Sequence, residues 1–223
     1  MNSRERIRPW WTLVEVGLVV ALFVADGYDL VPLSNTPFLL ALGWISLRLR
    51  GLGWRDVGFA LPRSWSLALA LGALAGIGTE LFALFVTEPT IARLVGTHPD
   101  LSDFRPLVGN LGLLLVFLFL NWTLAAFGEE LAHRGYVMNR LADLGHRSRP
   151  AWLVSLLLTS VLFGWGHHEG QGFAGMLLEG VNGLLLGLLY LASGRYLVVP
   201  IVAHGVANTL AFVLIYLGRY PGL

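Results

Sequence analysis

The chain has 223 residues, of which 56% are hydrophobic and only 13% are charged, with a formal net charge of +1 and no cysteine. Soluble globular domains carry about 25% charged residues, so this composition excludes an ordinary soluble domain. The small net charge argues against a nucleic-acid partner, and the lack of cysteine excludes disulfides, thiolate nucleophiles and cysteine-ligated metals.

Apolar stretches follow one another along the chain, and several approach the roughly 20 residues that a helix needs to cross a bilayer. The predicted spans cover about residues 10–25, 37–49, 65–86, 107–144, 150–166, 173–192 and 196–217. The connector 51–59 is too polar to span and is expected at the membrane interface. Residues 87–106 contain three prolines, which break helices, and this stretch is predicted to be a loop.

These stretches predict an all-α fold, a polytopic membrane bundle of about seven or eight transmembrane helices around a polar intramembrane cavity. We expect one domain over residues 1–223, with a motif-bearing core at about 107–217. Basic residues, beginning with Arg4, Arg6 and Arg8, flank alternate loops, so the positive-inside rule places the N-terminus in the cytoplasm.

The first apolar run resembles the core of a signal peptide, because basic residues precede it. It is followed by the acidic turn Asp26-Gly-Tyr-Asp29 and not by a small-residue cleavage site. We therefore expect this run to be retained as the first span.

The first cluster of ionisable residues follows the apolar half of segment 107–144. Such side chains are costly in a bilayer unless they are paired or face an aqueous cavity, so each is a functional candidate. Glu130 and Arg134 are four residues apart and share a helical face, where Arg134 can hold Glu130 ionised. Glu129 lies about 100° around the helix and can face a different cavity as a general base. A salt-bridged helix end at the membrane surface is the alternative.

Two further clusters lie on later spans. His167 ends an apolar span, where a lone histidine is usually an interfacial residue. His204 and Asn208 are four residues apart and share one face of the last span, where structural helix–helix hydrogen bonding is the alternative. Together, the three clusters suit water activation with oxyanion stabilisation, or a divalent metal bound by nitrogen and oxygen ligands.

These residues form three short motifs: Glu129-Glu130-x-x-x-Arg134, Phe163-x-x-x-His167 and His204-x-x-x-Asn208. In order and spacing the motifs resemble those of the CPBP family, the CAAX proteases and bacteriocin-processing enzymes that include the Ras-converting CAAX endopeptidase. The resemblance covers about residues 107–217, which is half of the chain.

The resemblance implies an intramembrane endopeptidase that hydrolyses a peptide bond with a glutamate-activated water. Glu129 would activate the water with the assistance of His167, while His204 and Asn208 would stabilise the oxyanion. The family includes members described as metalloproteases, so a divalent metal such as Zn²⁺ stays open as a cofactor. Glu129, His167 and His204 are its expected ligands if a metal is used.

The same resemblance implies that Glu130 and Arg134 form a supporting pair. Two histidines depart from the family pattern. His133 stands where the family often has an aromatic residue. His168 adjoins the motif histidine His167, so either imidazole could be the functional one.

The predicted span ends conflict with a shared site. They put Glu129 and His204 towards the cytoplasmic side and His167 at the opposite end of its span. We expect segment 107–144 to be kinked or re-entrant, which would bring Glu129 to mid-depth.

Two other functions are alternatives to the protease. A non-catalytic immunity or partner-binding protein of the same fold would use the motif residues as structural polar contacts. A small transporter is suggested by further polar residues within spans, although they are scattered in the sequence and no inverted repeat is apparent. These residues are Glu15, Glu80, Glu179 and Asn182.

The expected partners are membrane lipid and a peptide or protein substrate, either a lipidated CAAX tail, a leader peptide or a membrane-protein segment. No nucleic-acid partner is expected. Short, arginine-rich connectors suggest the plasma membrane of a prokaryote, by analogy.

Overall fold

The computed structural model describes residues 9–28, 30–32 and 34–223, and helices connected by short loops account for these residues, with no β-strand among them. The all-α prediction is therefore confirmed. The predicted basic segment with Arg4, Arg6 and Arg8 lies outside the described residues, and so does Asp29 of the acidic turn.

Most predicted spans coincide with helices, and some consecutive helices join without a loop. The α-helices are α1 (Pro9–Asp26), α2 (Thr36–Leu49), α3 (Trp65–Phe82), α4 (Glu88–Val95), α5 (Leu111–Leu120), α6 (Met138–Leu144), α7 (Arg149–Trp165), α8 (His168–Ala192) and α9 (Val198–Tyr216). Wider π-helical turns are η3 (Ala83–Thr87), η5 (Asn121–Glu129) and η6 (Leu131–Val137), and the 3-10 segments are η2 (Trp54–Val57) and η4 (Ser102–Leu107).

Among the described residues, four helices are long and apolar enough to cross a membrane, and they are Trp65–Val95, Leu111–Leu144, His168–Ala192 and Val198–Tyr216. Two further apolar helices, α2 and α7, are shorter. Many large apolar side chains on the outer faces are exposed, as expected for contact with lipid. The predicted count of seven or eight spans stays a prediction, as does the single domain over the whole chain.

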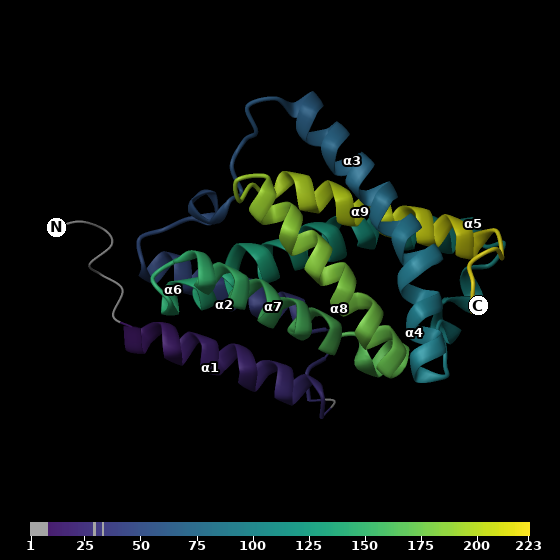
Figure 1. Cartoon of the computed structure of the whole chain (residues 1–223), viewed down its shortest axis with the longest axis horizontal. Helices are drawn as coiled ribbons and strands as arrows, with labels where there is room; N and C mark the ends of the chain where they lie inside the picture. Colours follow the sequence, from purple (N-terminus) through teal and green to yellow (C-terminus); the bar gives the residue numbers. More distant parts are fainter. Residues whose placement is uncertain (1–8, 29, 33) are drawn as a thin grey trace.

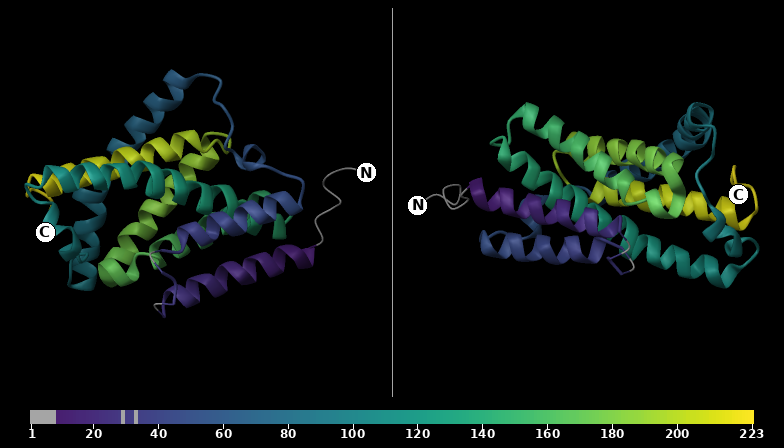
Figure 2. Two further views of the ribbon diagram at one scale, coloured as in Figure 1. Left: turned by 180° about the vertical axis from the view of Figure 1, so that it is seen from behind. Right: turned by 90° about the horizontal axis from the view of Figure 1, so that it is seen from below.

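The helices pack in two groups that α8 connects (Figure 1). In one group α3 lies across α9, and α5 runs beside α9 (Figures 1 and 2). In the other, α7 packs against α6, and α1 lies along the outer edge against α6 and α2. Because α8 packs closely against α7 and also contacts α9, the residues of the two groups meet along α8.

The predicted loop at 87–106 was wrong for its first part, because Glu88–Val95 is helix α4. Pro89 lies inside the continuous helix Trp65–Val95, where its missing N–H removes one helical hydrogen bond. The π-helical turn η3 directly before it widens the helix and lets α3 continue into α4. The helix therefore passes through a proline that the sequence pattern treats as a breaker.

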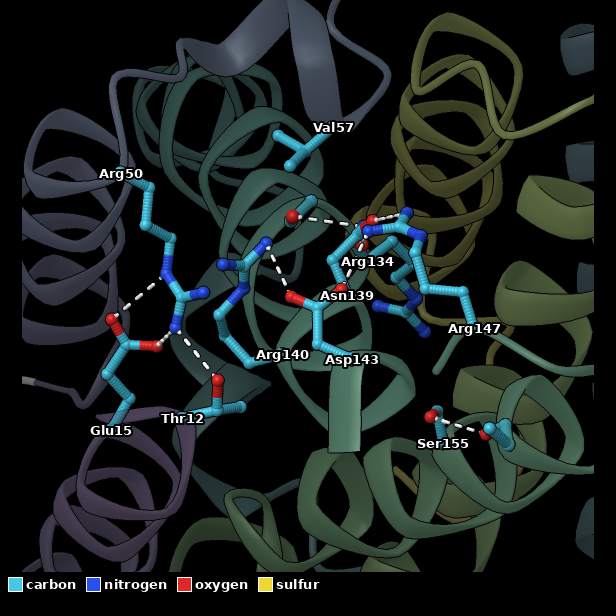
Figure 3. A network of polar contacts seen from close by, with 12 residues as sticks. Thr12, Glu15, Arg50, Val57, Arg134, Asn139, Arg140, Asp143, Arg147 and Ser155 are labelled. Carbon is cyan, nitrogen blue, oxygen red and sulfur yellow. Dashed lines mark hydrogen bonds and ion pairs between the residues drawn. The ribbon is translucent and has the colours of Figure 1, made fainter. Parts of the chain in front are cut away.

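Polar contacts join α1 to the end of α2 (Figure 3). Arg50, at the end of α2, forms a buried ion pair with Glu15 and donates to the Thr12 hydroxyl at 3.1 Å. Glu15 is therefore committed to a structural pair. It does not join Glu80 and Glu179 in a common pathway, which weakens the transporter hypothesis.

Glycines allow α3 and α9 to approach closely. A Cβ at Gly76 would lie 2.9 Å from Cβ of Val206 and would overlap the Ala203 carbonyl oxygen. Gly78, on the outer face of the same helix, has no atom within 4 Å of such a Cβ. Small residues at membrane helix crossings permit this kind of backbone contact.

Replacing Gly76 by leucine is therefore expected to destabilise the protein by about 1–3 kcal/mol, the usual cost of overpacking. Thermal unfolding of the purified protein in detergent measures the effect. Gly78→Leu is the matched control, because it makes the same change of helix propensity without a packing conflict. Equal melting temperatures for the two variants would contradict the assigned α3–α9 contact.

Candidate active site

The two consecutive glutamates of the first motif point to different surroundings. They lie where η5 meets η6 inside the continuous helical unit Leu111–Leu144. Glu130 is completely buried, whereas Glu129 is half-buried and lines a cavity. π-Helical turns are rare and often occur at functional sites. The unit is continuous across both π segments, so the re-entrant alternative does not apply.

Glu130 connects two distant parts of the chain. Its Oε1 accepts hydrogen bonds from Nη1 of Arg134 at 2.8 Å and from Nδ1 of His204 at 3.0 Å. The Arg134 contact follows the predicted four-residue spacing, and the His204 contact joins the unit Leu111–Leu144 to α9. Nη2 of Arg134 donates to the carbonyl oxygen of Gly183 on α8 at 2.8 Å. These contacts join the unit Leu111–Leu144 to both α8 and α9.

The ring of Phe163, on α7, lies at the centre of the motif residues. The imidazole centroids of His133, His167 and His204 lie 5.1, 5.0 and 6.0 Å from its centroid. The guanidinium carbon of Arg134 lies 4.7 Å from the same centroid, a cation–π distance. Phe163 is 2% exposed, so these contacts lie in the interior.

A cavity of about 240 Å³ opens beside this cluster. Four of the six predicted site residues line it, and they are Glu129, His167, His204 and Asn208. Residues of the loop before α5 and of the C-terminal tail, including Phe104 and Tyr220, line the same cavity. The predicted convergence of the three motifs is therefore present in the geometry, while the catalytic roles of these residues stay predictions.

The hydrogen bonds of two imidazoles determine which nitrogen atoms are available to the cavity. Nδ1 of His167 donates to the Phe163 carbonyl oxygen at 2.8 Å, which leaves Nε2 as the free ring nitrogen. Nδ1 of His204 bonds to Glu130, which again leaves Nε2. A histidine whose Nδ1 is fixed in this way presents a defined tautomer at Nε2.

The two histidines noted as departures do not line the cavity, although the His133 ring also packs against Phe163. His133 is buried, its Nδ1 bonds to the Glu129 carbonyl oxygen at 3.0 Å, and it does not line the cavity. His168 is exposed and stacks on Trp165 with ring centroids 5.8 Å apart. The geometry therefore separates both from the motif histidine His167.

Among the residues that the structure describes, no group of three His, Asp or Glu side chains is placed to hold a metal ion. Glu129, His167 and His204 share a cavity wall without forming such a group. The side chains as placed do not fit the metal that the family resemblance left open, and no step of the chemistry below depends on one.

Sequence reasoning missed that further carboxylates gather beside the motif residues. Glu179 and Glu88 line the cavity of about 240 Å³, which we call the main cavity. Glu80 lines a smaller recess next to it. Burial raises the pKa of the Tyr220 phenol above its usual range, and the carboxylates of Glu80 and Glu179 raise it further. The only sequence signal for these acids was their position within apolar spans.

Residues 111–210, somewhat less than half of the chain, match the family model described as type II CAAX prenyl endopeptidase Rce1-like. All three motifs lie within the matched stretch, so the resemblance to the CPBP and CAAX proteases is confirmed there. No curated protein and no solved structure matches the chain. With four helices that can span a bilayer, the match indicates an integral membrane protein with a protease role.

Proposed function

We propose, from the Rce1-like family match over residues 111–210, that the chain is an intramembrane endopeptidase in which Glu129 activates the hydrolytic water. The single observation that supports this proposal best is the shared cavity of Glu129, His167, His204 and Asn208. These residues come from three segments that are distant in sequence. A glutamate-dependent mechanism suits these side chains, since they supply a base and hydrogen-bond donors at one place.

In the proposed reaction, the Glu129 carboxylate accepts a proton from water while Nε2 of His167 accepts the second water hydrogen in a hydrogen bond. The resulting hydroxide attacks the peptide carbonyl carbon. Protonated His204 and the Asn208 amide donate hydrogen bonds to the oxyanion as it forms. Glu129 then gives its proton to the leaving amine nitrogen as the C–N bond breaks, which leaves a new carboxyl and a new amino terminus.

Glu130 and Arg134 act as positioning residues in this scheme. Glu130 accepts the Nδ1–H of His204 at 3.0 Å, so a proton on Nε2 is directed away from Glu130. A carboxylate at Nδ1 also stabilises the imidazolium form of a histidine. Arg134 fixes Glu130 from the other side at 2.8 Å.

The substrate is proposed to be a peptide or protein segment at the membrane, either a lipidated CAAX tail or a leader peptide. The membrane is proposed to be a prokaryotic plasma membrane with the N-terminus in the cytoplasm. These two proposals rest on the family resemblance and on the distribution of basic residues.

A panel of lipidated CAAX peptides, leader peptides and transmembrane segments, incubated with purified protein in nanodiscs, tests the activity. Mass spectrometry should detect cleavage of at least one class by wild type and none above background by Glu129→Gln. Cleavage of no class, together with protection of cells against a peptide toxin that persists in Glu129→Gln, would instead establish the non-catalytic immunity role.

A further inference from the structure

A small recess of about 60 Å³ adjoins the candidate active site. Glu80 of α3 and Glu179 and Asn182 of α8 line it, together with Tyr220 of the C-terminal tail. The recess shares Glu179, His204, Asn208 and Tyr220 with the wall of the main cavity, so the two lie against each other.

Two acceptor atoms in the recess are left without a partner. Glu80 is 6% exposed, and its Oε1 has no hydrogen-bond partner among the described residues. Nδ2 of Asn182 donates to Glu179 at 3.2 Å, while its own Oδ1 is buried and also unpartnered in the part of the chain that the structure describes. An unmet buried acceptor is costly, and most of all for a carboxylate. Both atoms can accept a hydrogen bond from a bound water or from a donor that a ligand brings.

The ionisable side chains that line the recess are Glu80, Glu179, His204 and Tyr220. None of the described residues that line the recess or the main cavity is an arginine or a lysine. The third neighbouring carboxylate, Glu88, is already bonded to His98 and so is less available to a ligand. Burial raises the pKa of the Tyr220 phenol, and the neighbouring Glu80 and Glu179 carboxylates raise it further, as expected beside acidic side chains.

We propose that this recess is a specificity subsite that binds the cationic head group of an arginine or lysine side chain of the substrate, close to the scissile bond. The inference rests on the proposed protease function. An ammonium or guanidinium group carries several N–H donors, which matches the two carboxylates and the amide oxygen.

The apolar part of the lining completes the fit. Leu178 and Ala211 line both the recess and the main cavity, so both have apolar surface where they adjoin. Long cationic side chains place their methylene stems along apolar surface while the head group reaches polar partners. A volume of about 60 Å³ suits a head group and not a whole side chain.

A peptide series tests the subsite. One position at a time near the scissile bond of a cleaved peptide is changed to arginine, lysine or norleucine, and kcat/KM is measured. Wild type should prefer the basic residue at one fixed position by about tenfold or more over norleucine, as a charged hydrogen bond contributes. Glu80→Gln, which keeps the shape and removes the charge, should lose this preference and still cleave the norleucine peptide.

Asp103→Asn is the matched control, because Asp103 is an exposed acid on η4, whose Phe104 lines the main cavity. It should keep the wild-type preference. Equal rates for arginine and norleucine peptides in wild type, or an unchanged preference in Glu80→Gln, would overturn the subsite and leave the protease proposal standing.

Binding of fluorescent arginine and norleucine peptides to Glu129→Gln and to Glu129→Gln/Glu80→Gln separates the two proposals further. Tighter arginine binding that depends on Glu80 supports the subsite. Equal binding of both peptides overturns it. Absence of cleavage by wild type in the same preparation contradicts the protease function itself.

Discussion

Glu129→Gln is expected to lower kcat for peptide cleavage by about 10²–10⁴-fold, the usual contribution of a positioned general base. Glutamine has the same shape as glutamate but cannot take the proton from the attacking water. Because the Glu129 side chain lines the cavity and forms no ion pair with another described residue, the fold should be unaffected. Initial rates on a cleaved peptide measure the loss of kcat, and a thermal melt measures whether the fold is unchanged.

A change at the adjacent Glu130 should affect stability, in contrast to Glu129→Gln. Glu130→Gln should lower the melting temperature, because Oε1 of Glu130 accepts from both Arg134 and His204 in the interior. Asp56→Asn, an exposed acid at another cavity, should change neither property. Full activity of Glu129→Gln on the same peptide would rule out Glu129 as the base.

Arg134→Met is expected to reduce the free energy of unfolding by about 3–5 kcal/mol, the usual cost of removing one partner of a buried ion pair. Arg134 is 2% exposed and Glu130 is fully buried, so water cannot replace the lost guanidinium. The change also removes the hydrogen bond to Gly183 and the contact with the Phe163 ring. Denaturant titration in mixed micelles, followed by tryptophan fluorescence, measures the loss.

Two further variants give the Arg134 prediction its controls. Arg93→Met removes an exposed arginine and should cost little, as surface charges usually do. Glu130→Gln/Arg134→Met removes both charges and should recover part of the loss, because no unpaired charge is then buried. A stability of Arg134→Met equal to that of wild type would contradict the assigned pair.

The features that the sequence predicted well depend on local spacing. The Glu130–Arg134 contact follows from the four-residue repeat of a helix, and the divergence of Glu129 from Glu130 follows from the 100° turn per residue. The apolar runs predicted most helices, because burial in lipid or in the core requires continuous apolar stretches. Family motifs supplied the order in which distant residues would meet.

The features that the sequence missed depend on packing between distant segments. His204 and Glu130 are 74 residues apart, and no spacing rule predicts their hydrogen bond. Glu80 and Glu179 are scattered in the sequence, yet the crossing of α3, α8 and α9 places them at one recess. Proline normally breaks a helix, and the π turn before Pro89 that accommodates it has no clear sequence signature. The continuation of the helix past Pro89 is therefore not predictable from the sequence.

The most direct test of the central claim is kcat/KM for one cleaved peptide, measured with purified wild-type protein before and after exhaustive chelation. Activation of water by the Glu129 carboxylate predicts cleavage at an unchanged rate after chelation. Loss of activity on chelation that returns when zinc is added would contradict a glutamate-activated water.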